Sequence, residues 1–296
     1  MVFHLYFAGA QAMVSEELME ANSNYRLLSY WHDKKRIERR RDMGLLTFID
    51  SGAFTSHTKG IEVDVDTYID YLNERIDSID CAAQVDEIPG TFGLPKSKKD
   101  LIEAPIISWD NYLYMEKRVK QPEKILPVFH QFEKFKHFET MVNYGVPYIG
   151  ISPSNEISVS QKIPWINECF KIIEKSGRTD VKIHAFGMTS LNVLEMYPFY
   201  SADSTSWLMT SANGAIMSKY GTIFVSERGI QDRKHIFNLS KETQLEIERY
   251  VNSLGYNLKD LSESYKERSN FNITYLTHWA KNYQYKPQTV KQFKLF

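Results

Sequence analysis

The chain has 296 residues, and its 36 Lys and Arg against 37 Asp and Glu give a formal net charge of −1. This balance leaves no global field that would attract a nucleic acid or a membrane, so any polyanion must be met by local patches. Two cysteines are too few for a four-thiolate zinc site or a disulfide framework, and the apolar N-terminus is too short to span a bilayer, so we expect a cytoplasmic protein without a membrane partner.

Short apolar runs that predict strands alternate with stretches of helical periodicity. The predicted strands are residues 3–8, 45–50, 81–86, 125–130, 147–152, 181–187, 199–203 and 222–226. The predicted helices are residues 66–79, 108–119, 132–144, 164–176, 189–197, 208–219 and 241–254, with Pro164 at a first helical position.

Eight such alternations are the pattern of a (β/α)8 TIM barrel, which we expect over residues 1–254 as the catalytic domain. The rival α/β arrangement is a doubly wound open sheet, but no glycine-rich dinucleotide fingerprint follows the first strand. Residues 255–296 form a polar, tyrosine-rich C-terminal extension with one predicted helix at 272–284.

Three predicted strands end in an aspartate: Asp50, Asp86 and Asp203. Each one alone could cap a helix or close a turn. The active site of such a barrel lies at the C-terminal ends of its strands, so the three side chains would converge on one mouth. A carboxylate placed there must be hydrogen-bonded, paired or used, because burying it bare is costly.

Three carboxylates without a His or Cys cluster do not resemble a zinc site, whereas a magnesium site stays open in principle. The alternative is carboxylate chemistry at a sugar carbon, where one acid attacks and another handles protons. Phe54 lies just beyond one predicted strand and Phe186 at the end of another, so the two rings could sandwich a flat heterocycle, although either ring could equally be core. Crowding should raise the pKa of at least one of the three acids.

Six motifs together resemble the tRNA-guanine transglycosylases (queuine tRNA-ribosyltransferases). "DSGAFTS" is similar to their nucleobase-binding turn, and "AQVDE", "FHQF", "GIS", "AFGM" and "SADSTS" follow in the family's order at roughly its spacings, over residues 3–226. The chain has no counterpart to the family's three-Cys, one-His zinc module. It therefore most resembles the zinc-less, DpdA-like phage and bacterial proteins that exchange guanine for a 7-deazaguanine in DNA.

The resemblance implies roles for individual positions. Asp203 matches the nucleophile that attacks C1′ of the sugar, and Asp50 matches the acid that handles protons. Asp86 and Gln131 match the residues that read the edge of the base. The other predicted substrate-binding residues are the stacking walls Phe54 and Phe186, the backbone at Gly150, Ile151 and Gly187, and Ser51 in the turn, with Asn155 or Glu156 near a substituent at position 7.

The implied chemistry needs no cofactor, and the free 7-deazaguanine is a second substrate. The polymer must be held by its phosphates, and we expect Lys34, Lys35, Arg36, Lys98 and Lys99 to do so, although such runs are also typical of plain solvated surfaces. Three alternatives stay open: the same chemistry on tRNA, a barrel hydrolase that cleaves a glycosidic bond, and an inactive partner subunit that only presents nucleic acid.

Overall fold

A computed structural model describes residues 3–9, 18–20, 25–31, 36–91, 94–154, 156–188 and 190–285. The chain divides into two compact units. The barrel unit comprises Met1–Tyr6, Tyr25–Asp203 and Gln284–Phe296, and the second unit comprises Phe7–Asn24 and Ser204–Tyr283. This division differs from the expected boundary after residue 254, because the chain leaves the strand-and-helix alternation at Ser204 rather than after a further strand.

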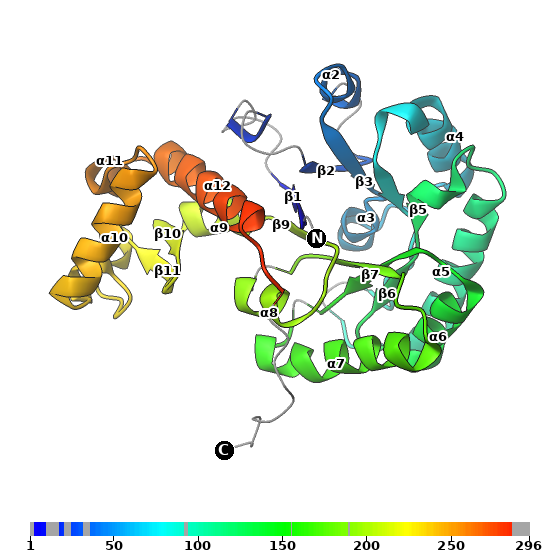
Figure 1. The fold of residues 1–296 in the computed structure, drawn as a ribbon. Helices are drawn as coiled ribbons and strands as arrows, with labels where there is room; N and C mark the ends of the chain where they lie inside the picture. The colour runs from blue at the N-terminus through cyan, green and yellow to red at the C-terminus, as the bar shows by residue number, and fades with distance from the viewer. Residues whose placement is uncertain are drawn as a thin grey trace. The chain divides into compact units, whose positions relative to one another are not determined.

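The barrel unit is an α/β fold around one nine-stranded sheet of order β5-β4-β3-β2-β1-β9-β8-β7-β6 (Figure 1). The strands are β1 His4–Phe7, β2 Tyr25–Ser29, β3 Leu46–Asp50, β4 Cys81–Ala83, β5 Ile125–Leu126, β6 Val128–His130, β7 Tyr148–Ser152, β8 Lys182–Ala185 and β9 Ser201–Ser204. The pairs β2–β3, β3–β4, β4–β5, β6–β7, β7–β8 and β8–β9 are parallel.

The two ends of this sheet, β5 and β6, are separated in the chain by Pro127 alone. Proline has no N–H and interrupts a strand ladder. Its carbonyl still accepts a hydrogen bond from the N–H of Gly150 on β7, at 2.8 Å. The sheet is therefore nearly closed and barrel-like, which is compatible with the expected TIM barrel.

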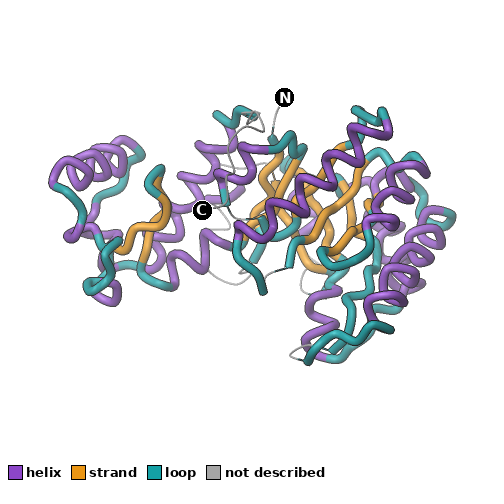
Figure 2. Tube along the Cα trace, turned by 90° about the horizontal axis from the view of Figure 1, so that it is seen from below, coloured by secondary structure: helices purple, strands orange, loops and turns teal. Residues whose placement is uncertain are grey.

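Apolar side chains from the strands form one cluster in this sheet. Its buried members are Tyr6, Phe48, Cys81, Ala83, Leu126, Val128 and Tyr148. Helices follow most strands and lie outside them (Figure 2). They are α2 Arg36–Asp42, α3 Ala53–Lys59, α4 Val65–Arg75, α5 Asp100–Glu116, α6 Phe135–Tyr144, α7 Val159–Ser176 and α8 Leu191–Met196, with 3₁₀ turns η1 Ile76–Ser78 and η2 Pro122–Lys124. Burial on both faces explains why the strands read as continuous apolar runs.

The second unit packs helices against a short antiparallel hairpin. Its elements are α9 Ser206–Ala212, β10 Ala215–Ser218, β11 Gly221–Phe224, η3 Glu227–Gly229, η4 Ile236–Asn238, α10 Lys241–Ser253, α11 Leu258–Glu263 and α12 Tyr265–Lys281. The side chain of Asn272 ties α12 to its neighbours, because it accepts from the N–H of Met217 and donates to Ser211 Oγ, at 2.8 and 2.9 Å.

Seven of the eight predicted strands lie in the sheet of the barrel unit, but the eighth does not. Residues 222–226 fall largely on β11, in the separate two-stranded sheet. Its place in the barrel unit is taken by β2, which the sequence did not reveal because Arg26, a fully buried cation, interrupts its apolar pattern.

Several predicted helices also need correction. The stretch 208–219 is helical only as far as Ala212, and its end forms β10. The stretch 164–176 belongs to a longer helix, α7, which starts at Val159 because Ser158 and Gln161 form a capping box, so Pro164 lies inside the helix. The predicted helix 272–284 corresponds to α12, which starts earlier, at Tyr265.

Candidate active site

Three aspartates from different strands of the barrel unit act on one another electrostatically. Asp50 ends β3, Asp86 follows β4, and Asp203 lies within β9, where it is 7% exposed. Burial, followed by the charges of Asp86 and Asp203, raises the pKa of Asp50 from 3.8 to about 7. The pKa of one acid is therefore raised as expected, although burial contributes more to the shift than the crowding of the acids.

The turn after Asp50 requires glycine. Gly52 has a left-handed backbone with φ of 83°, and a Cβ placed there would lie 2.3 Å from Cδ1 of Trp31. The N–H of Gly52 donates to Oδ2 of Asp50 at 3.1 Å, and Oγ of the buried Ser51 donates to Oδ1 of Asp86 at 3.1 Å. The "DSGA" segment therefore holds two of the three carboxylates from one turn.

A histidine that was not among the predicted site residues joins Asp86 to a second acid. Nε2 of His130 lies 2.9 Å from Oδ2 of Asp86, and its Nδ1 lies 2.9 Å from Oε1 of the buried Glu133. Burial lowers the pKa of His130, but the hydrogen bonds and charges of the two acids outweigh it and raise that pKa to about 10. His130 is therefore a buried imidazolium at neutral pH.

A strained turn brings Glu133 back to His130. The N–H of Glu133 bonds to the carbonyl of His130 at 3.3 Å, and Phe132 between them has a φ of 82°. This left-handed conformation is unusual for a bulky side chain and is found mainly where surrounding structure enforces it. The ring of Phe132 is 49% exposed, with Nζ of Lys96 at 5.6 Å from its centroid. The sequence "FHQF" did not predict this turn, because a turn with this backbone normally has glycine at the position of Phe132.

The carboxylate of Asp203 is held on one oxygen. Its Oδ1 accepts from the N–H of Gly187 at 2.8 Å and lies 3.4 Å from Nε2 of the fully buried His184. Gly187 has a φ of 56°, a conformation that places its N–H toward the strand and suits glycine. The sequence analysis selected Gly187 but not His184, which directly precedes the "AFGM" motif.

The predicted base-reading residue Gln131 is buried, and its Oε1 accepts from the N–H of Ser154 at 3.1 Å. The side-chain NH₂ is therefore the group that Gln131 can present to a carbonyl. Gly150 and Ile151 on β7 use their backbone within the sheet, since the carbonyl of Ile151 accepts from Phe186 at 2.9 Å. A Cβ on Gly150 would lie 2.4 Å from the Phe186 ring, so this glycine makes room for that ring.

The two predicted stacking walls lie in different surroundings. Phe54, in the first turn of α3, is 59% exposed. Phe186 follows β8 and is partly buried, with its ring edge-on to Phe48 and to His184 at 5.6 and 4.4 Å between centroids. Their joint stacking on a base stays a prediction.

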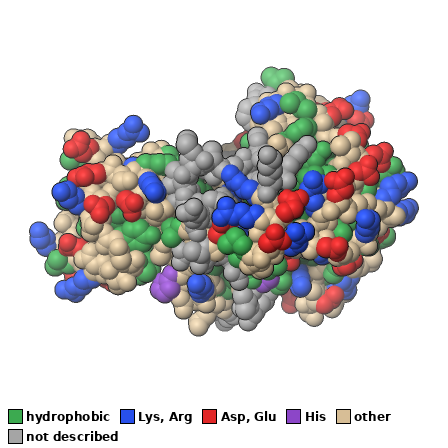
Figure 3. All heavy atoms as spheres, turned by 90° about the horizontal axis from the view of Figure 1, so that it is seen from above, with side chains coloured by type: hydrophobic (Ala, Val, Ile, Leu, Met, Phe, Trp, Pro, Cys, Tyr) green, Lys and Arg blue, Asp and Glu red, His purple; other side chains and the backbone are tan. Residues whose placement is uncertain are grey.

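The predicted phosphate-binding residues are placed in part. Lys34 and Lys35 lie outside the described residues. So does Asn155, which was predicted to lie near the substituent at position 7 of the base. Arg36 begins α2, whereas Lys98 and Lys99 are exposed just before α5, and Glu156 is exposed after β7. Figure 3 shows basic and acidic side chains intermixed over one face of the molecule, so any nucleic-acid contact would be local.

Within the described part of the chain, no group of three or more His, Cys, Asp and Glu side chains is arranged to hold a metal ion. No helix there is long and apolar enough to cross a membrane. No protein-family model matches the chain, and a search of curated proteins finds no match.

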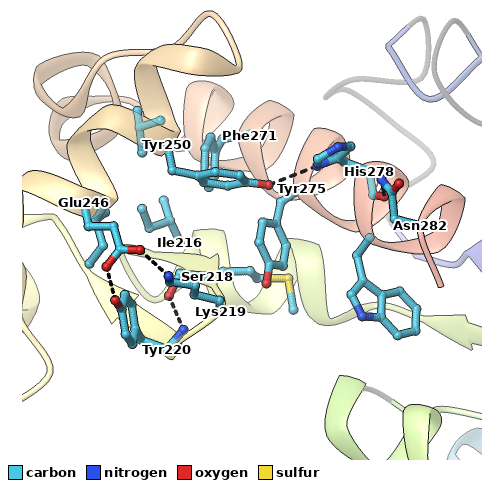
Figure 4. A pocket seen from close by; sticks show the side chains of 14 residues that line it. Ile216, Ser218, Lys219, Tyr220, Glu246, Tyr250, Phe271, Tyr275, His278 and Asn282 are labelled. Carbon is cyan, nitrogen blue, oxygen red and sulfur yellow. Dashed lines mark hydrogen bonds and ion pairs between the residues drawn. The ribbon is translucent and has the colours of Figure 1, made fainter. Parts of the chain in front are cut away.

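The second unit contains a separate aromatic pocket between its hairpin and helices α10 and α12 (Figure 4). Tyr250 and His278 meet at its rim, with the tyrosine hydroxyl 3.3 Å from Nδ1. The carboxylate of Glu246 contacts both Lys219 and Tyr220. Because the one acid that lines this pocket is already paired, the three aspartates of the barrel unit are the better candidates for chemistry.

Proposed function

We propose that the protein is a (β/α)8-barrel transglycosylase that exchanges guanine in DNA for a 7-deazaguanine base. The observation that carries this proposal is that Asp50, Asp86 and Asp203 lie on or just after strands of one barrel-like sheet, where burial and then the charges of Asp86 and Asp203 raise the pKa of Asp50 to about 7. Retaining chemistry at an anomeric carbon needs one carboxylate as nucleophile and a second group that exchanges protons. The motif resemblance assigns the first task to Asp203 and the second to Asp50.

In the first half-reaction, a carboxylate oxygen of Asp203 forms a bond to C1′ while the bond from C1′ to N9 of guanine breaks. The bonding electron pair leaves with guanine, and Asp50 supplies a proton to the departing base. A carboxyl with a pKa of about 7 is suited to this, because it gives and takes protons at neutral pH. No oxidant or reductant is required.

In the second half-reaction, the ring N–H of the incoming 7-deazaguanine loses its proton to Asp50. The new bond to C1′ forms from the side that guanine left, and the ester to Asp203 breaks. The net result retains configuration at C1′ and regenerates both acids.

Recognition of the base falls to Asp86 and Gln131. Ser51 and His130 each donate to one oxygen of Asp86, so both oxygens serve as acceptors and each has a further lone pair for an N–H of the base. The NH₂ of Gln131 can donate to the base carbonyl. This pattern of acceptors and donor is complementary to the edge of guanine, which presents N–H groups beside a carbonyl.

The target base must leave its stack to reach this site, by flipping or by already being unpaired. Arg36, Lys98 and Lys99 are the described cations that we expect near the phosphates. Acting on cellular or phage DNA would place the activity in the cytoplasm of a bacterium or an infected host. The same chemistry on tRNA is the second candidate, favoured by the family resemblance alone.

Exchange of labelled base tests the proposal. The full chain is incubated with radiolabelled guanine and with either DNA or tRNA. Unlabelled 7-deazaguanine is then added as a chase. We expect label to enter DNA and to be displaced by the 7-deazaguanine. Label in tRNA alone would move the activity to that polymer. Release of guanine without incorporation would indicate a hydrolase, and neither outcome with either polymer would refute the transferase.

A further inference from the structure

A chain of polar side chains runs through the barrel unit to Asp203. The hydroxyls of Tyr148 and Ser201 lie 2.6 Å apart, and Oγ of Ser201 lies 2.7 Å from Nδ1 of His184. Nε2 of His184 faces Oδ1 of Asp203 at 3.4 Å. These groups sit on three adjacent strands, β7, β8 and β9, and each of them is at least 90% buried.

Burial lowers the pKa of His184, so its imidazole is neutral and carries one N–H. The two tautomers differ sharply in this site. With the proton on Nδ1, the lone pair of Nε2 would face the buried oxygen of Asp203, and two acceptors would oppose each other without a donor. With the proton on Nε2, the N–H lies on the side of that oxygen, at an N···O distance of 3.4 Å that is too long for a well-formed hydrogen bond, and Nδ1 accepts from the hydroxyl of Ser201.

One hydrogen bond and one longer electrostatic contact then fall on the same oxygen of Asp203. Oδ1 accepts from the N–H of Gly187 at 2.8 Å and faces the N–H of His184. Among the residues that the structure describes, both polar contacts of the carboxylate fall on Oδ1, so Oδ2 is the oxygen that keeps its lone pairs for a reaction. We propose that His184, set in its Nε2–H form by Ser201, is a positioning residue that fixes the carboxylate of Asp203 so that Oδ2 is the attacking atom.

This inference rests on the proposed function, because it names the reacting oxygen of the proposed nucleophile. A purely structural role would not need imidazole here. His184 packs edge-on against the rings of Tyr6, Phe48 and Phe186, surroundings that an apolar side chain could also fill. Nδ1 of the ring bonds to Ser201, and Nε2 faces the carboxylate of Asp203 at 3.4 Å.

Three variants of the full chain test the proposal: His184→Leu, His184→Gln and Ser201→Ala. Glutamine retains an N–H donor at about the place of Nε2, whereas leucine retains only the bulk. The readouts are the thermal melting temperature, the affinity for a guanine-containing single-stranded DNA oligonucleotide, and the rate at which that oligonucleotide becomes covalently attached to the protein.

For His184→Leu we expect oligonucleotide affinity within about twofold of the wild type and an attachment rate lower by about 100-fold, as for a misplaced reacting group. His184→Gln should recover most of that rate, and Ser201→Ala should fall between them. A His184→Leu protein that melts like the wild type and attaches DNA equally fast would overturn the proposal, as would failure of glutamine to restore the rate.

A second measurement does not depend on activity. Nitrogen-15 NMR of histidine-labelled wild-type protein, with His184 assigned through His184→Gln, reports which ring nitrogen carries the proton. A proton on Nε2 supports the positioning role, and a proton on Nδ1 or on both nitrogens contradicts it. If the wild type attaches neither DNA nor tRNA, the transglycosylase proposal fails, and the tautomer alone then decides the geometry proposed for His184 and Asp203.

Discussion

His130 and Asp86 form a buried ion pair, with Nε2 of the histidine 2.9 Å from Oδ2 of the aspartate. On the other side of the ring, Glu133 contacts Nδ1 at the same distance. One cation thus serves two acids, and this arrangement fixes the orientation of the side chain that we expect to read the base. Among the described residues Oε2 of Glu133 finds no hydrogen-bond partner, which leaves the second acid dependent on His130.

His130→Leu should therefore destabilise the protein by about 3–5 kcal/mol at neutral pH, because it leaves two acids without their shared cation. The folded state raises the pKa of His130 from 6.5 to about 10, so the stabilisation is fully present below pH 6.5 and is lost as the pH rises toward 10. Urea unfolding of both proteins at several pH values measures the difference. His137→Leu, on the partly exposed side of α6, is the control. A difference that did not shrink between pH 7 and 10 would contradict the assignment.

Asp50→Asn should stabilise the protein at alkaline pH while impairing the reaction. The folded state raises the pKa of Asp50 from 3.8 to about 7, so the folded protein binds the extra proton and wild-type stability falls as the pH rises through that interval. Above pH 8 the variant should gain up to about 4 kcal/mol over the wild type, and below pH 4 the gain should vanish. Its base-exchange rate should drop by about 10²- to 10⁴-fold.

The stability arm uses thermal melting between pH 4 and 9, with Asp70→Asn on the exposed side of α4 as the matched control. Equal melting temperatures of wild type and Asp50→Asn at every pH would show that the folded state does not raise the pKa of Asp50. An unchanged exchange rate would remove Asp50 from the proton transfers.

Phe132→Gly should stabilise the protein, although it deletes an aromatic ring. The φ of 82° is strained for phenylalanine and free for glycine, and the ring is 49% exposed, so little packing is lost. We expect a gain of about 1 kcal/mol from relief of the left-handed conformation. Phe132→Ala, which keeps the strain and loses the ring, is the control and should show no gain. A loss of stability in the glycine variant would mean that the ring itself holds the turn.

Lys98→Ala combined with Lys99→Ala should weaken binding of a DNA oligonucleotide and reduce its dependence on salt. Each phosphate contact removed should lower the slope of log affinity against log salt by about 1. Lys171→Ala combined with Lys175→Ala, a similarly exposed pair on α7, is the control. Fluorescence anisotropy at several salt concentrations measures both. Identical slopes for the two double variants would exclude the loop before α5 from the DNA contact.

Local sequence patterns were enough to predict many residues of the candidate site. Asp50, Asp86 and Asp203 were recognisable because an acid at the end of an apolar strand is costly, and the strand periodicity predicted that such ends meet. The turn at Gly52 followed from its small residues. Short-range patterns of this kind do not depend on which distant segment becomes the neighbour.

Features that depend on distant partners could not be predicted. His130 lies within the "FHQF" motif and His184 directly precedes "AFGM". Their contacts depend on Glu133, which the strained turn brings back to His130, and on Ser201, which lies on the strand next to His184. Strand β2 was not predicted for the same reason. Arg26 interrupts its apolar pattern, and the burial of this side chain is decided by tertiary packing and not by its own chemistry.

Covalent capture on Asp203 tests the central claim most directly. The full chain is mixed with guanine-containing DNA or tRNA, denatured in acid and digested, and the peptide that contains Asp203 is weighed by mass spectrometry. We expect a nucleotide adduct on that residue with DNA, and none with Asp203→Asn. An adduct on another side chain, or equal labelling of the Asp203→Asn protein, would contradict it.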